Sequence, residues 1–189
     1  MTTFDPHTCG PQIAELLLPE RLNELGPGRA NQSARERLES LRPHDLAAVP
    51  PGRDLQLAEA CCAGLWLYHD FLDQSHEISQ GIETATGSYW HGIMHRREPD
   101  AGNAKYWFRR VGLHLVFSEL AEQAAALARE DHASEASLAR GFASGEWDPF
   151  RFIDLCEKVR GTGSPNELLC RRIAQAEWRL LFDYCWNEG

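Results

Sequence analysis

The sequence has no excess of basic residues and no apolar run long enough to cross a membrane. Its 28 acidic residues outnumber its 19 basic ones, and the formal net charge is −9. That balance argues against a general nucleic-acid or anionic-membrane surface. The first residues, MTTFDPHTCGPQ, lack the basic and apolar regions of a secretory signal. We therefore expect a cytoplasmic protein with neither a nucleic-acid nor a membrane partner.

Several motifs of covalent and nucleotide chemistry are also missing. None of the six cysteines forms a CxxC pair. Five of them lie among apolar residues at helical spacing, namely Cys61, Cys62, Cys156, Cys170 and Cys185. This setting predicts buried, reduced thiols rather than disulfides or a zinc cluster. Neither a GxSxG nucleophile motif nor a glycine-rich phosphate loop occurs.

Helical periodicity recurs along the chain, and no alternating strand pattern of useful length interrupts it. We predict an all-α fold, a single-domain helical bundle of about eight or nine helices. Residues 1–50 should form an N-terminal helical arm packed on a main bundle over residues 54–187. A proline-rich run at 49–52 separates them, but no second core is evident, so residues 1–189 are expected to form one domain.

Capping residues place several helices. Asp54 should cap a helix that ends near residue 81. Residues 57–72 of this helix are apolar on nearly all sides, so we expect it to be the buried central helix of the bundle. Ser88 should cap a helix over residues 89–97. Asp148, followed by Pro149, should open another. A short helix is expected over residues 134–142, and the last long helix over about residues 165–186.

Residues 87–112 are the most unusual stretch of the chain, with the sequence GSYWHGIMHRREPDAGNAKYWFRRVG. They contain two tryptophans, two histidines and five basic residues. The pattern GSYWHxIMHRREPDxxNAKYWFRRVG resembles a block shared by a family of bacterial and fungal proteins, and HDFLDQSHEISQ upstream resembles a second shared block. The likeness covers about residues 55–117. That family has no established activity, so the resemblance implies kinship without a reaction or a residue role.

His91 and His95 are one helical turn apart, so their rings can bind one metal ion. Glu98, three residues further on, could add an oxygen ligand. A second helix would complete the site, and its candidate ligands are His69, Asp73, His76 and Glu77. The spacing suits zinc, nickel or non-haem iron. Packing or simple surface exposure is the competing interpretation of such a histidine pair.

The basic residues of the same stretch suggest an anion site. Arg97 falls on the apolar face of its helix, where it needs a carboxylate or a bound anion, whereas Arg96 should point into solvent. Arginine side chains bind carboxylate and phosphate groups in a forked geometry. The candidate substrate-binding residues are Arg97, Lys105, Arg109, Trp90 and Tyr106. Alternatively, the arginines pair with Asp70, Asp73 and Glu77 and only lock the bundle.

Two functions therefore remain open. The first is an enzyme acting on a small anionic molecule, with His91, His95 and His69 as catalytic groups. In that case a divalent metal would be bound by His91, His95, His76 and Asp73. The second is a non-catalytic helical binding or scaffold module whose charged stripe is a structural salt-bridge network. The sequence leaves homo-oligomer formation open.

Overall fold

The structure is a computed structural model that describes residues 4–47, 54–131, 141–142 and 145–187. Within these ranges all regular secondary structure is helical, which confirms the predicted all-α bundle. The α-helices are α1 (Pro11–Leu17), α2 (Arg35–Ser40), α3 (Pro43–Ala47), α4 (Leu55–Tyr68), α5 (Leu72–Ser79), α6 (Ala85–Arg97), α7 (Ala101–Val111), α8 (Val116–Glu130), α10 (Pro149–Val159) and α11 (Pro165–Asn187). Two 3-10 helices, η1 (Pro6–Cys9) and η2 (Gln32–Ala34), complete them. The loop expected at 49–52 and nearly all of the helix expected over 134–142 lie outside the described residues.

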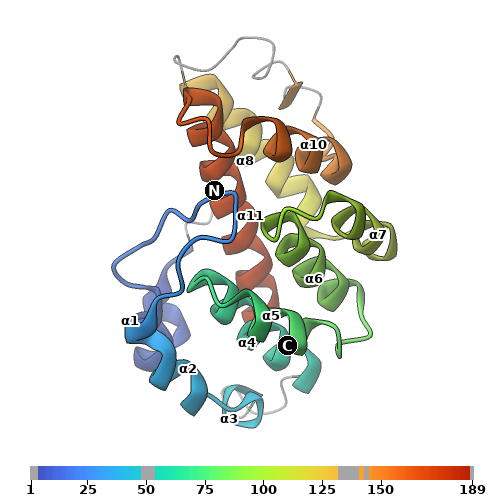
Figure 1. Cartoon of the computed structure of the whole chain (residues 1–189). Coiled ribbons are helices and arrows are strands. Elements are labelled where there is room, and N and C mark those ends of the chain that lie inside the picture. Colours follow the sequence, from blue (N-terminus) through green and yellow to red (C-terminus); the bar gives the residue numbers. More distant parts are fainter. Residues whose placement is uncertain (1–3, 48–53, 132–140, 143–144, 188–189) are drawn as a thin grey trace.

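The long helix α11 runs through the middle of the molecule, with α8 and α10 at one end and α4 and α5 at the other (Figure 1). Helices α6 and α7 lie side by side on one flank. The short N-terminal helices α1 to α3 lie beyond α4, and both α2 and α3 contact it. This arrangement surrounds α4 and α6 with other helices, so both are buried over most of their length.

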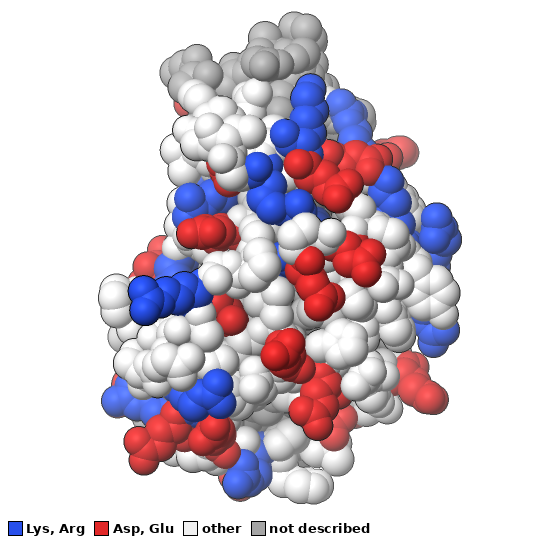
Figure 2. Space-filling view, in the orientation of Figure 1, with Lys and Arg blue, Asp and Glu red and all other residues white. Residues whose placement is uncertain are grey.

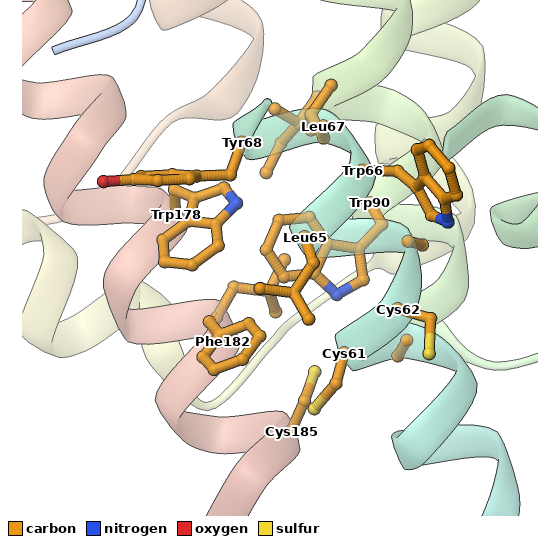
Figure 3. Close-up of a cluster of buried hydrophobic side chains, with 14 of the residues drawn as sticks. Cys61, Cys62, Leu65, Trp66, Leu67, Tyr68, Trp90, Trp178, Phe182 and Cys185 are labelled. Atoms are coloured by element: carbon orange, nitrogen blue, oxygen red, sulfur yellow. The ribbon is translucent and has the colours of Figure 1, made fainter. Parts of the chain in front are cut away.

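Helix α4 is the buried central helix that the sequence predicts. Asp54 caps it by accepting a hydrogen bond from the backbone of Gln56, and nearly all of its later residues are buried. The indole rings of Trp90 and Trp178 lie against it in the core (Figure 3). A Cβ atom at Gly64 would lie 2.8 Å from the Trp90 ring. Glycine at this position therefore allows α6 to approach α4 closely.

The predicted continuation of this helix to residue 81 is wrong, because the chain breaks at Asp70. Helix α4 ends at Tyr68, Asp70 has a positive φ of 64°, and α5 begins two residues later. The Asp70 carboxylate accepts hydrogen bonds from Arg21 (2.8 Å), Asn23 (2.8 Å) and Arg97 (2.6 Å). These donors stabilise a left-handed conformation that is uncommon for a residue with a side chain. The break turns α5 back against α6.

Helix α6 begins earlier than predicted. Thr84 is the N-cap, and its hydroxyl accepts a hydrogen bond from the backbone of Gly87 at 3.0 Å. Ser88 therefore lies inside the helix rather than at its start. Every residue from Thr86 to Arg97 is buried. Since α4, α5 and α7 all contact this helix, even its polar residues must find partners inside the protein.

The later helix starts follow the sequence more closely. Asp148 caps α10 by accepting hydrogen bonds from the backbones of Phe150 and Arg151, with Pro149 in the first turn. Helix α11 begins at Pro165, and Ser164 accepts a hydrogen bond from the backbone of Glu167 at 3.2 Å. The predicted cap at Asp148 and the predicted start of the last helix near residue 165 are therefore confirmed.

Acidic and basic side chains are interspersed over the face of the molecule shown in Figure 2. Neither sign gathers there into one large continuous patch. Among the described helices, none combines the length and the apolar character that a membrane span requires.

Candidate metal centre

Three histidines from two helices meet in the interior. His76 lies on α5, and His91 and His95 lie one turn apart on α6. One ring nitrogen from each lies within 4.8 Å of the other two. His91 and His95 are 2% and 7% exposed, whereas His76 is partly exposed. All three histidines are among the metal ligands predicted from the sequence. The change of chain direction at Asp70 places α5, and with it His76, against α6.

The separations approach those of nitrogen ligands on one metal ion. The Nε2 atoms of His91 and His95 lie 3.0 Å apart. Two nitrogens bound to one tetrahedral zinc at ~2.0–2.1 Å would be about 3.3 Å apart. No separation in the group exceeds 4.8 Å, so closing it requires a shift of about 1.5 Å at most. His76, the partly exposed member of the group, would make most of that shift.

The outer nitrogens of the two α6 histidines are also occupied. His95 Nδ1 lies 3.0 Å from a carboxylate oxygen of Glu98, and His91 Nδ1 lies 3.3 Å from the Ser79 hydroxyl. A hydrogen bond at the second ring nitrogen fixes the orientation and tautomer of a metal-binding histidine. The sequence allows Glu98 as an oxygen ligand, but its carboxylate contacts the ring nitrogen of His95 that faces away from His91. In this position it orients His95.

Helix α7 covers one side of the group. The Trp107 ring stacks on His91, with ring centroids 4.0 Å apart and an interplanar angle of 28°. The Arg110 guanidinium lies 5.1 Å from the Trp107 ring centroid. A Cβ atom at Gly92 would lie 2.8 Å from the Phe108 ring, so glycine here allows the close contact of α6 and α7. That contact holds Trp107 over the imidazole.

Burial keeps the two α6 imidazoles neutral at neutral pH. The pKa of His91 is lowered to about 3, first by burial and then by the neighbouring His95 and His76. Burial also lowers the pKa of His95, although the hydrogen bond that His95 donates to Glu98 opposes that shift. A neutral imidazole has a free lone pair, which a metal ion requires. Protons therefore compete little for these two nitrogens near pH 7.

The remaining predicted metal or catalytic residues lie outside this group. His69 follows the last residue of α4 and is 3% exposed, and its Nδ1 lies 3.0 Å from the side-chain nitrogen of Asn31. Asp73 lies in the first turn of α5 and is exposed. Neither belongs to the cluster of potential ligands that His76, His91 and His95 form within the described residues.

Arg97 is engaged inside the fold. Its guanidinium bonds Asp70 at 2.6 Å and the backbone carbonyls of Gly26, Pro27 and Leu67 at 2.8–3.3 Å. These contacts agree with the alternative in which the arginine pairs with a carboxylate of the chain. They also fix the extended segment after α1 against α6.

The expectation that Arg96 is solvated is wrong. Arg96 is 2% exposed and forms an ion pair with Glu177 of α11, which also accepts a hydrogen bond from Tyr89 at 3.0 Å. The Arg96 guanidinium lies 4.7 Å from the centroid of the Phe152 ring. A helix with only one buried face would expose this residue, but Glu177 of α11 and Phe152 of α10 contact the Arg96 side chain inside the protein.

The other candidate substrate-binding residues have separate surroundings. Lys105 forms an ion pair with Asp154, and Arg109 lies 5.9 Å from the Phe150 ring centroid. Trp90 is wholly buried in the core, whereas Tyr106 is 49% exposed. The contact of Ser79 with His91 has no signal in the sequence, because it depends on the packing of α5 against α6.

No family model matches the chain, and no curated protein or solved structure matches it, so the geometry of the histidine group is the basis for the functional proposal.

Proposed function

We propose that the protein binds a divalent transition metal ion through His76, His91 and His95. The observation that carries this proposal is the convergence of three ring nitrogens within 4.8 Å. Nitrogen ligands suit zinc, nickel and iron better than magnesium or calcium, which prefer oxygen. Zinc is the preferred candidate because it readily accepts three histidines and retains one further position.

The fourth coordination position of a bound ion would be open to water or a substrate, which would give the site a chemical role. With three protein ligands, a bound ion would lower the pKa of a water molecule to about 7 and polarise an oxygen of a substrate. We therefore extend the proposal to metal-assisted chemistry on a small anionic molecule. The exposed Arg110, placed over Trp107 beside His91, supports the anionic character of that substrate.

The chain's own residues would orient the ligands. Glu98 would hold the proton on His95 Nδ1, so that Nε2 presents its lone pair to the ion. Ser79 would do the same for His91 when its hydroxyl accepts from Nδ1. The same hydroxyl can donate to the carbonyl of His76, which lies 3.3 Å away. Both histidines would thereby bind through the nitrogens that already face each other.

Titration of metal-free protein with Co²⁺ tests this proposal. We expect one equivalent to bind with the strong visible absorption of four-coordinate cobalt, and zinc to displace it. His76→Ala and His91→Ala should abolish the band, whereas His44→Ala, which changes an exposed histidine on α3, should retain it. Absence of a band in the wild-type protein, or its persistence in His91→Ala, would contradict the proposal.

A second candidate function is a non-catalytic helical module, and one observation favours it. Both buried arginines of α6 form ion pairs within the protein, Arg96 with Glu177 and Arg97 with Asp70. In that role the charged residues of α6 would fix the relative positions of helices rather than bind a substrate. Absence of the cobalt band would favour this second function, because a scaffold held by ion pairs needs no metal.

A further inference from the structure

A small cavity lies apart from the histidines, bounded by α4, α6, α11 and the segment just before Gly26. Its volume is about 40 Å³. Apolar groups of Leu67, Tyr68, Ile93 and Trp178 form much of its wall. Since one water-sized group needs about 10–15 Å³ by this measure, the cavity has room for about three such groups.

Cationic groups border this cavity as well. Arg96, Arg97 and Arg171 all contribute to its lining. Two of them have carboxylate partners, whereas Arg171 bonds the backbone carbonyls of Leu22 (2.6 Å) and Asn23 (2.9 Å). Backbone carbonyls carry no formal charge, so Arg171 is not neutralised by these partners. Glu24 is the one carboxylate among the lining residues that the structure describes.

Arg96 supplies a second observation that points to a ligand. It is 2% exposed, and its Nη1 has no hydrogen-bond partner among the described residues. A buried donor on a charged group is costly to leave without an acceptor. Arg96 lines the cavity, and an acceptor that reaches Nη1 would satisfy the donor.

We propose that this cavity binds a short-chain carboxylate, with its carboxylate at Arg96 Nη1 and its short apolar tail against Tyr68 and Trp178. An apolar wall with a few charged donors is typical of small-ligand sites, and a carboxylate offers the acceptors that a guanidinium prefers. Acetate and propanoate match the available space. The proposal is independent of the metal centre.

Propanoate is the probe that tests this site. We would titrate it into chelator-treated protein and follow the indole and guanidinium resonances of Trp178 and Arg96 by NMR. We expect saturable shifts in the millimolar range, because a ligand of so few atoms makes few contacts. Nuclear Overhauser effects should connect the propanoate methyl group to the Trp178 and Tyr68 rings. Absence of saturable shifts, or of these effects, would overturn the proposal and leave a cavity that holds water only.

Ala174→Leu provides the blocking variant. Ala174 lines the cavity from α11 and is partly exposed, so the larger side chain can fill the space with little strain. Propanoate shifts should be lost in this variant. The same substitution at the partly exposed Ala125 of α8, away from the cavity, should leave them unchanged. Shifts that persist in Ala174→Leu would contradict the assignment.

Comparison of propanoate with an uncharged compound tests whether the carboxylate charge is needed for binding. Propan-1-ol has a similar apolar tail but no carboxylate, so it should produce at least tenfold weaker binding than propanoate. Equal binding of the two compounds would overturn the assignment of a carboxylate site. If Ala174→Leu does not fold, this comparison and the Overhauser effects in the wild-type protein still decide the question.

Discussion

The Nε2 atoms of His91 and His95 face each other at 3.0 Å, and one of them must carry a proton if no metal lies between them. A carboxylate only accepts hydrogen bonds, so the contact of Glu98 with His95 places a proton on His95 Nδ1. Neutral His95 then accepts at Nε2, and His91 must donate from Nε2. The Ser79 hydroxyl then donates to His91 Nδ1.

Metal binding should therefore reverse the tautomer of His91. In metal-free protein we expect the His91 proton on Nε2, and in zinc-loaded protein on Nδ1, with His95 protonated on Nδ1 in both. Long-range proton–nitrogen NMR spectra of the imidazoles measure this directly. An unchanged His91 pattern after addition of one equivalent of zinc would show that the ion does not bind at Nε2.

Glu98→Gln should weaken metal binding by about 10- to 100-fold, the usual effect of losing a carboxylate behind a histidine ligand. The amide can still accept a hydrogen bond, but it raises the basicity of His95 less than a carboxylate does. Competition with a chromophoric zinc chelator gives the dissociation constant. Glu77→Gln, which alters an exposed carboxylate on α5, is the matched control. Equal affinities for the two variants would show that Glu98 does not support the site.

Arg97→Met should lower the free energy of unfolding by about 3–5 kcal/mol, because it leaves the Asp70 carboxylate without its α6 partner. Urea denaturation monitored by tryptophan fluorescence measures the loss. Arg37→Met breaks an exposed ion pair with Glu15, and its effect should stay within about 0.5 kcal/mol. An Arg97→Met protein as stable as the wild type would indicate that Arg97 serves a ligand rather than the fold.

Acid should destabilise the protein through His69. Burial and the nearby Arg21 lower the pKa of His69 to about 4, whereas an unfolded histidine has a pKa near 6.5. As the pH falls from about 6.5 to about 4, the unfolded state binds a proton that the folded state does not, which costs up to ~1.4 kcal/mol per pH unit. The stabilising contribution is complete above pH 6.5 and is lost on acidification.

His69→Gln tests this assignment. Its free energy of unfolding should fall less steeply between pH 6.5 and pH 4.5 than that of the wild type, whatever its stability at pH 7. His44→Gln, at an exposed position, should retain the wild-type slope. Identical slopes in all three proteins would show that His69 does not contribute to acid destabilisation.

Local signals in the sequence predicted much of the fold. Asp54 and Asp148 begin helices where their capping side chains indicate, and the apolar run after Asp54 is buried. The break at Asp70 has no such signal, because no proline or glycine marks it. Its donors, Arg21 and Asn23, lie 47–49 residues earlier in the chain, so the break depends on tertiary contacts.

The candidate site was predictable to the same limited extent. The spacing of His91 and His95 places both rings on the same side of α6. This follows from the geometry of a single helix and needs no knowledge of how the helices pack. The choice of His76 over His69 as their partner depends on the direction of α5 after the break. The burial of Arg96 depends on Glu177, 81 residues away. Residue spacing therefore predicts the candidate ligands on one helix, whereas the ligand from the second helix can be identified only once the packing of the helices is known.

The carboxylate of Asp70 joins the irregular segment after α1 to the helix that bears two of the histidines, since it accepts from Arg21 and Asn23 on one side and from Arg97 on the other. A truncated protein that starts after Asn23 would lose two of these three donors. We expect such a truncation to loosen α6 from α4 and to disturb the geometry of His91 and His95. Arg21 and Asn23 thus support the interior from outside the helices, and their removal should weaken the proposed binding of a metal ion at the histidines.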